Sequence, residues 1–457
     1  MSGLATEVAT WVSRLTYADL PDDVVDATRL RLLDVLGLSL AGSESAFGAA
    51  TRAAAVMMTP GGASRIFGSG DQVAPMTAAF ANAAFSQGLE YDDTHNESIV
   101  HMSSPAVTAG LALSETMGVS GRDLVLAIAL ANEVSCRVGC VAPGQFHRLG
   151  FHPTALFAPF GITCLAGRLL GLDVETLSHA LGTCGSTAAG LLECWVDGTQ
   201  TKFLHSGFAA QNGIAAALLA QAGVTGPPRV FEGRFGLFAS HLQDGTLTKN
   251  FGRITDGLGE TWDSRKSSFK PYPAAHVLHP YLDALLRVRE AHGIRPENVM
   301  KIDCPVAAFI VPIVCEPIDE KCEPATQAHG RVSLQYTMAE ALYRGRLGKD
   351  AYEAFEDPEI RALARRVSYH VDPSYPGPGR FKGAVRLTLR DGSVIEDVQE
   401  YNRGSAENPM TDAELRAKFD ENAAGVLPAP ARERLADAIL RVDELPDART
   451  IVDLAVA

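Results

Sequence analysis

The 457-residue sequence lacks several features that would assign it to a particular class of protein. It has no stretch of about 18 uninterrupted apolar residues, so we expect no membrane-spanning helix. It has no run of lysine and arginine and its net charge is −14, which argues against a nucleic-acid partner. No basic segment followed by an apolar one stands at the N-terminus, so we predict a cytoplasmic protein.

Paired cysteines and the common nucleotide-binding motifs are also missing. The eight cysteines form no CxxC pair and no zinc-type spacing, and most lie in apolar segments, so we expect them to be reduced core residues. There is no GxGxxG after a predicted strand, no Walker loop and no GxSxG motif. The sequence therefore gives no support to a zinc, nucleotide or serine-hydrolase site.

The composition and the apolar patterns predict two domains. With 46% apolar and 21% charged residues, the chain is typical of a soluble globular protein. Helices between residues 5 and 240 are apolar on nearly all sides, which indicates a large helical core. Val299–Val314 is predicted as a strand, and Asp391-Gly392 as the turn of a hairpin. We therefore predict a mostly α fold with an α+β second domain: a discontinuous helical domain, residues 1–265 and 403–457, and a smaller lid, residues 266–402.

The stretch from Glu90 to Pro105 concentrates polar groups between two apolar helices. Pro75 is predicted to open the upstream helix, and Ser104-Pro105 to begin the downstream one. Such short connections are where a rigid scaffold holds polar chemistry. The acidic, hydroxyl and imidazole members are Asp92, Asp93, Thr94, His95 and His101. They could cap helix ends or bind a metal, but they have no established ligand spacing and we predict no metal.

Basic and imidazole residues stand at the starts of three predicted helices. His101, His152 and Lys202 each precede or open one, and helix N-termini favour negatively charged ligands. Lys270 and the nearby His276 and His279 lie at the predicted domain junction, where a ligand could be enclosed. The two histidines are three residues apart, so one of them is expected only to pack. Together these residues predict a site for a substrate with several carboxylates.

The motifs around these residues resemble those of the MmgE/PrpD family, which includes 2-methylcitrate dehydratases, cis-aconitate decarboxylases and iminodisuccinate epimerase. The similarity extends over essentially the whole chain, and its markers are Glu90-Tyr-Asp-Asp-Thr-His95 with His101, Gly150-Phe-His-Pro-Thr154, Asp197-Gly-Thr-Gln-Thr-Lys202, Lys270-Pro-Tyr-Pro273 and Ser333-Leu-Gln-Tyr336. The resemblance implies a large helical domain, an α+β lid, a homodimer, and catalysis on di- or tricarboxylates without a cofactor. It implies catalytic roles for Asp93, His101, His152 and Lys202, and substrate binding by Thr94, Lys270, His276, His279 and Tyr336.

Some residues depart from the family pattern. Met102 follows His101 where the family usually has proline, and His205-Ser206-Gly207 replaces a frequent His-Pro-Gly. Val311–Thr326 also looks unlike the decarboxylase branch. Because the first two changes lie beside the predicted cleft, we expect the substrate to differ from that of better-known members, and Met102 to be the main point of difference.

We predict a lyase, more narrowly a dehydratase, that removes a proton next to a carboxylate of a 2-methylcitrate-like hydroxy-polycarboxylate. His101 and His152 would transfer protons, Asp93 would orient or tune one of them, and Lys202 and Lys270 would bind carboxylates. Closure of the lid would complete the site.

Within the first stretch, Asp93 and His101 are the expected working pair, whereas Asp92 and His95 are expected to be structural. A decarboxylase or an epimerase on the same scaffold is an alternative, because both reactions also form a carbanion or enolate next to a carboxylate. A non-catalytic carboxylate-binding protein is the alternative from another class.

Overall fold

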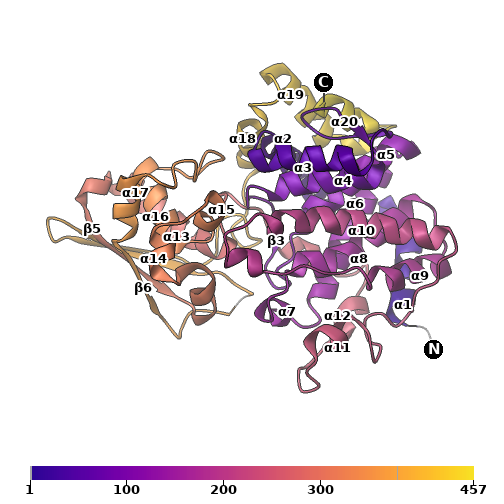
Figure 1. Cartoon of the computed structure of the whole chain (residues 1–457), viewed down its shortest axis with the longest axis horizontal. Coiled ribbons are helices and arrows are strands. Elements are labelled where there is room, and N and C mark those ends of the chain that lie inside the picture. The colour runs from indigo at the N-terminus through magenta and orange to yellow at the C-terminus, as the bar shows by residue number, and fades with distance from the viewer. Residues whose placement is uncertain (1–2, 378, 457) are drawn as a thin grey trace.

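A computed structural model describes residues 3–377 and 379–456 and shows two packed bodies (Figure 1). Each body has its own hydrophobic core. The first core draws on residues from Ala5 to Trp262 and again from Phe419 to Ala455. The second core lies wholly between Ala274 and Leu389. The chain thus leaves the first body once and returns to it. The predicted class, a large helical domain with a smaller α+β domain, is confirmed.

The first body is helical. Its helices are α1 (Leu4–Arg14), α2 (Asp22–Ser43), α3 (Ala46–Met58), α4 (Pro75–Gln87), α5 (Ser103–Met117), α6 (Gly121–Gly139), α7 (Gln145–Arg148), α8 (Pro153–Leu169), α9 (Val174–Cys184), α10 (Leu204–Gln221), α11 (Leu237–Leu242) and α12 (Gly252–Thr255). The returning segment adds α18 (Asp412–Ala423), α19 (Ala429–Leu440) and α20 (Arg449–Ala455). Helix α18 packs on α2, and α20 packs on α5.

Small residues let the central helices α4, α5, α6, α8 and α10 approach closely. A Cβ at Gly161 of α8 would lie 2.2 Å from the carbonyl oxygen of Ala131 in α6. A Cβ at Gly207 of α10 would lie 2.6 Å from the carbonyl oxygen of Phe80 in α4. These helices are therefore covered on most sides, which explains why their sequences are apolar all round.

The second body contains a four-stranded sheet with helices against it. The strands are β5 (Val299–Val306), β6 (Val367–Val371), β7 (Gly383–Leu389) and β8 (Val394–Gln399), in the order β6-β5-β7-β8. Strands β5 and β6 are parallel, and the other two pairs are antiparallel. The helices are α13 (His279–His292), α14 (Ile318–Cys322), α15 (Gln327–Gly330), α16 (Leu334–Arg344) and α17 (Pro358–Ala364).

The hairpin at Asp391-Gly392 is confirmed, and Gly392 adopts a φ of 86° there. The strand predicted over Val299–Val314 is half wrong, because β5 ends at Val306 and short helical turns follow up to Cys315. Its neighbour β6 ends at Val371, the partner of Val306, so no ladder remains for later residues. Burial of Val314 and Cys315 in the second core then replaces strand pairing.

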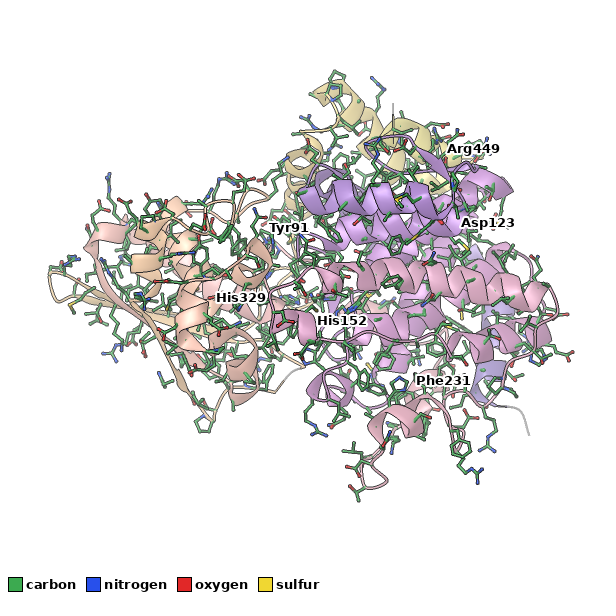
Figure 2. All side chains as sticks on the ribbon, viewed as in Figure 1. Tyr91, Asp123, His152, Phe231, His329 and Arg449 are labelled. Atoms are coloured by element: carbon green, nitrogen blue, oxygen red, sulfur yellow. The ribbon has the colours of Figure 1, made fainter. Side chains whose placement is uncertain are left out.

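The two bodies meet around a two-stranded pairing of β3 (Thr94–His95) with β4 (Ser267–Ser268). A second short pair, β1 (Ser64–Arg65) with β2 (Gln72–Val73), lies elsewhere in the helical body. Figure 2 places Tyr91, His152 and His329 near the junction. No helix in the described part of the chain is long and apolar enough to cross a membrane. All eight cysteines are buried and free, as predicted.

Candidate active site

The segment from Leu89 to His101 runs between α4 and α5 and is almost completely enclosed. Asp92, Asp93 and His101 are all buried, and strand β3 fixes the segment against β4. Glu90 adopts a φ of 54°, a left-handed conformation that is uncommon for residues other than glycine. The segment therefore turns sharply just before its acidic residues, inside the protein.

His101 is oriented by contacts at one ring nitrogen. Its Nδ1 lies 3.0 Å from the backbone oxygen of Asp93, 3.2 Å from Oγ1 of Thr94 and 3.3 Å from Oδ1 of Asp92. The carbonyl and carboxylate oxygens can only accept, so we assign a proton to Nδ1. Its backbone N–H also donates to Oγ1 of Thr154, at 3.0 Å. In the neutral ring the free lone pair is then on Nε2, the nitrogen available for proton transfer.

The carboxylate beside His101 belongs to Asp92, so the predicted side-chain pair of Asp93 and His101 is wrong. The side chain of Asp93 accepts from Oγ of Ser103 at 2.6 Å and lies 3.5 Å from Nε of Arg31. Adjacent residues in extended backbone point to opposite sides, so only one of the two aspartates can face the ring. Asp93 reaches His101 through its carbonyl alone, and Asp92 takes the role proposed for it.

The two aspartates also differ in charge environment. Burial acts to raise the pKa of Asp92, but His101 and Lys270 outweigh it and hold the pKa well below its ordinary value. Asp92 is therefore an ionised carboxylate against the imidazole. Burial raises the pKa of Asp93, and Arg31 only partly opposes this.

His152 has a different setting at the start of α8. Its ring centroid is 5.7 Å from that of His101, and its Nδ1 lies 2.9 Å from Nδ1 of His205. Burial, then His205 and Lys202, lower the pKa of His152 well below its ordinary value. Burial and Lys202 lower the pKa of His205 to about 4. Both rings are thus neutral near pH 7, and Nε2 of His152 is buried without a hydrogen-bond partner among the described residues.

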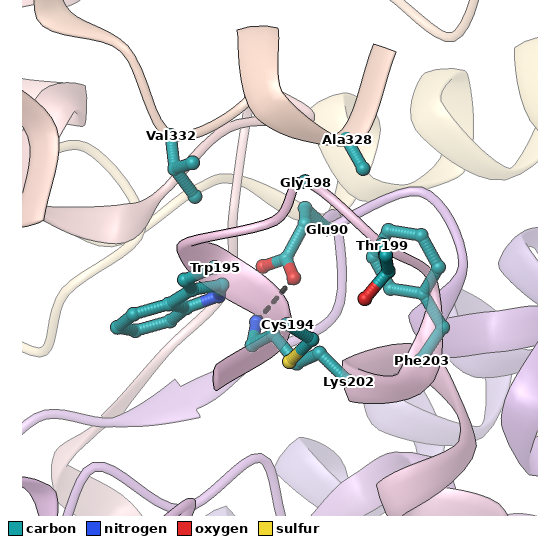
Figure 3. A pocket seen from close by; sticks show the side chains of 9 residues that line it. All are labelled: Glu90, Cys194, Trp195, Gly198, Thr199, Lys202, Phe203, Ala328 and Val332. Carbon is teal, nitrogen blue, oxygen red and sulfur yellow. Dashed lines mark hydrogen bonds and ion pairs between the residues drawn. The ribbon is translucent and has the colours of Figure 1, made fainter. Parts of the chain in front are cut away.

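Two lysines converge on Glu90, a residue that was not among the predicted site residues. Lys202 is ion-paired with its carboxylate (Figure 3). Nζ of Lys270 lies 3.7 Å from Oε2 and donates to the Glu90 backbone oxygen at 3.1 Å. Burial acts to raise the pKa of Glu90, but Lys202 and Lys270 hold it below its ordinary value. The signal for Glu90 was present in the sequence, since it begins the same acidic motif.

A small pocket of about 250 Å³, including the space at its mouth, opens beside this cluster. Glu90, Lys202 and Trp195 line it from the helical body, and Ala328 and Val332 line it from the second body (Figure 3). Oγ1 of Thr326 donates to the carbonyl oxygen of Gly198 across the same boundary, at 2.9 Å. The pocket therefore lies between the two bodies, where a cleft was expected.

His276 and His279 are both buried, and their contacts separate them. Nε2 of His276 accepts from Nδ2 of Asn402 at 2.9 Å, so its proton is on Nδ1, which has no partner among the described residues. Nε2 of His279 donates to the backbone oxygen of Ala274 at 3.2 Å. Burial, then His279, Lys270 and His101, lower the pKa of His276. Among the described residues His276 therefore has an unpartnered N–H at Nδ1, whereas His279 has an unpartnered lone pair at Nδ1.

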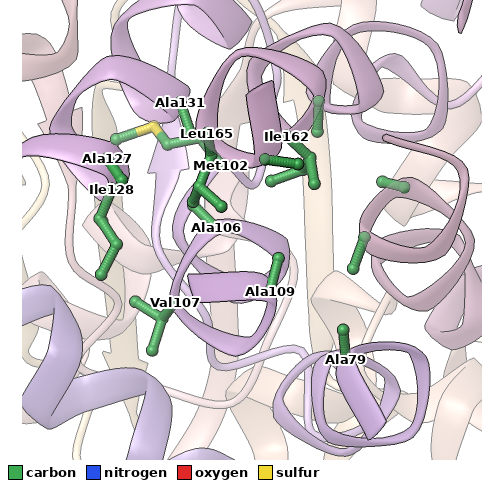
Figure 4. Close-up of a cluster of buried hydrophobic side chains, with 14 of the residues drawn as sticks. Ala79, Met102, Ala106, Val107, Ala109, Ala127, Ile128, Ala131, Ile162 and Leu165 are labelled. Carbon is green, nitrogen blue, oxygen red and sulfur yellow. The ribbon is translucent and has the colours of Figure 1, made fainter. Parts of the chain in front are cut away.

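Two residues singled out from the sequence lie outside the site. The hydroxyl of Tyr336 donates to the backbone oxygen of Ala354 at 2.9 Å, and its ring belongs to the second core, so we withdraw its substrate-binding role. Met102 is fully buried with its Sδ 3.3 Å from Sγ of Cys136, and it packs in the helical core (Figure 4). Met102 is the N-cap residue of α5, and its side chain lies in that core and not in the cleft.

His95, expected to be structural, is buried with its Nδ1 2.8 Å from Oγ of Ser98. Within the described ranges, no group of three or more His, Cys, Asp or Glu residues is arranged to hold a metal ion. The site is thus built from imidazoles, carboxylates and ammonium groups, which suit proton transfer and carboxylate binding.

Comparison with known proteins places this geometry in context. Cis-aconitate decarboxylase of Aspergillus terreus is 28% identical over 99% of this chain and 96% of its own. The enzymes of that name from Homo sapiens and Mus musculus are 25% and 24% identical, over 99% of this chain and 95% and 93% of their own. Residues 6–249 match the MmgE/PrpD N-terminal domain, and residues 272–444 match the MmgE/PrpD C-terminal domain. The chain therefore belongs to the MmgE/PrpD family.

Proposed function

We propose that the protein is a cofactor-independent lyase that acts on a small di- or tricarboxylate through a carbanion next to a carboxylate. The observation that carries this proposal is the buried contact between ionised Asp92 and Nδ1 of His101, in one cluster with Lys202 and Lys270. An imidazolium formed on His101 is stabilised by that carboxylate, while the lysines stabilise negative charge on the substrate.

In a decarboxylation, the bond between carbon and the departing carboxylate breaks, CO₂ leaves and the electron pair stays on carbon. His101, as the imidazolium with a proton on each ring nitrogen, then donates its Nε2 proton to that carbon and becomes the neutral ring, and solvent restores the proton. Lys202 and Lys270 bind the carboxylates that remain, so a substrate carboxylate competes with Glu90 for them. Burial strengthens these interactions because little water is present to screen them.

Decarboxylation of cis-aconitate or a close analogue is the first reaction to test, because the relatives described above carry that name. Dehydration of a 2-methylcitrate-like substrate, which the sequence favoured, is the second candidate. His152 supports it: a neutral imidazole with an unpartnered Nε2 lies 5.7 Å from His101, and dehydration needs both a base and an acid. Epimerisation would use the same two groups.

The test is to incubate the purified protein with cis-aconitate, 2-methylcitrate and citrate. Released CO₂ reports decarboxylation, and the absorbance of a conjugated product reports dehydration. We expect turnover of at least one substrate, no effect of a chelator, and loss of turnover in His101→Asn. If the wild type and this variant behave alike on all three substrates, the lyase proposal fails and a carboxylate-binding role replaces it.

A further inference from the structure

Three buried cations donate to three consecutive backbone carbonyls at the entrance to the acidic motif. Nη1 of Arg331 lies 2.8 Å from the oxygen of Leu89, and Nζ of Lys270 lies 3.1 Å from that of Glu90. Nζ of Lys418 lies 2.9 Å from the oxygen of Tyr91. Each of the three side chains is at most 5% exposed.

The three cations come from separate parts of the fold. Lys270 follows β4, Arg331 ends α15 in the second body, and Lys418 lies in α18 of the returning segment. Each forms its contact only when its own segment has packed against the helical body. The conformation of residues 89–91 thus depends on both the second body and the C-terminal helices.

Residues 89–91 need such support. Glu90 is in the left-handed region, where a side chain is strained, and its carboxylate must reach Lys202 while its carbonyl faces Lys270. Hydrogen bonds from charged donors are stronger than those from neutral ones, and they cannot be replaced by water in a buried segment.

Arg331 and Lys418 make contacts with backbone carbonyls and aromatic rings in addition to any ion pair with a carboxylate. Within the described residues Arg331 has no ion pair with a carboxylate; it also donates to the oxygen of Pro273 at 3.1 Å and lies 5.0 Å from the ring centre of Tyr352. Lys418 pairs with Asp34 at 2.7 Å, yet it also lies 4.0 Å from the ring centre of Tyr91. Both side chains therefore bind residues 89–91 beside the site.

We propose that Arg331 and Lys418 are positioning residues: together with Lys270 they hold residues 89–91 so that Glu90 meets Lys202 and Asp92 meets His101. Their effect on turnover rests on the proposed lyase function, whereas their effect on the segment does not. The lid and the returning helix then act directly on the geometry of the reactive imidazole.

Arg331→Met and Lys418→Met remove the charge, and Arg331→Lys and Lys418→Arg retain it. Hydrogen–deuterium exchange by mass spectrometry is measured on the full-length protein, together with kcat and KM for whichever of cis-aconitate, 2-methylcitrate and citrate the wild type turns over. We expect faster exchange over residues 88–101 in the methionine variants, with exchange in α8 and α10 unchanged. A small displacement of reacting groups can cost about 100-fold, so we expect kcat to fall by that order with KM little changed. The charge-retaining variants should recover most of both properties.

Lys321→Met is the matched control. Lys321 is also a buried lysine that donates to two carbonyl oxygens, those of Ile313 and Val332, at 3.0 and 2.8 Å. It should lower thermal stability without changing exchange over residues 88–101. Folded Arg331→Met and Lys418→Met proteins with wild-type exchange in that segment would overturn the proposal. If the wild type turns over no polycarboxylate, the lyase proposal fails, and the exchange data still decide the positioning role.

Discussion

The two imidazoles at the centre of the site, His101 and His152, lie 5.7 Å apart in opposite electrostatic environments. His101 has the ionised carboxylate of Asp92 at 3.3 Å. His152 faces His205 and Lys202, and burial with these neighbours drives its pKa down. Two groups of the same type in different electrostatic surroundings can take different catalytic roles. We therefore assign proton donation to His101 and a neutral base or hydrogen-bond role to His152.

Replacing each imidazole in turn should give the largest difference between the two histidines. His101→Asn should lower kcat for decarboxylation by about 10³-fold, because a positioned acid or base typically contributes 10²–10⁴-fold. His152→Asn should lower it by only about 10-fold, since decarboxylation needs one proton donor. Steady-state kinetics on variants with wild-type circular dichroism measures both. Equal losses in the two variants would contradict the assignment.

Replacing each of the two aspartates separately by asparagine tests which carboxylate acts on His101. Asp92→Asn should lower kcat by about 100-fold, because the imidazolium formed during proton transfer loses the carboxylate that stabilises it. Asp93→Asn is the matched control: it leaves the carbonyl contact to His101 intact but removes the partner of Arg31. We expect that variant to melt at lower temperature with kcat near the wild-type value. A larger loss of kcat in Asp93→Asn than in Asp92→Asn would reverse the roles.

Much of the fold could be predicted because its signals are local. Pro75 starts α4 and Asp391-Gly392 makes a hairpin, as their chemistry dictates. The apolar residues on nearly all sides of the central helices correctly predicted a large helical core. The end of β5 at Val306 could not be read from its β-branched sequence, because it depends on where the neighbouring strand stops.

The sequence predicted most of the residues that form the site, but it did not predict which side chains contact each other there. His101, His152, Lys202 and Lys270 do converge, whereas which of two adjacent aspartates faces the ring depends on local backbone direction. The hydrogen bonds from Arg331 and Lys418 to the backbone of residues 89–91 join positions far apart in sequence, so no spacing rule predicts them. Family position suggested Tyr336, yet its hydroxyl is used within the second core.

The smallest expected effect is a loss of stability at acid pH that arises from His205, the neighbour of His152. The folded-state pKa of His205 is about 4, below the ordinary 6.5, so the unfolded chain binds its proton first. This contribution to stability is present above pH 6.5 and is lost as pH falls toward 4, by about 2 kcal/mol between pH 7 and pH 5.

Urea unfolding of the wild type and of His205→Gln at both pH values measures it, since the variant should lose less stability on acidification. The raised pKa of Asp34, about 6, acts in the opposite direction, because its neutral form is favoured in the folded protein. An identical loss in the wild type and the variant would show that His205 is protonated in the folded state.

A crystal structure with tricarballylate, an unreactive tricarboxylate, is the decisive experiment for the proposed site. One carboxylate of the ligand should be bound by Lys202 and Lys270 in place of Glu90, with a ligand carbon facing Nε2 of His101 and Asp92 still against Nδ1. Binding of the ligand outside this cluster, or with His101 turned away from it, would show that the cluster is not the active site.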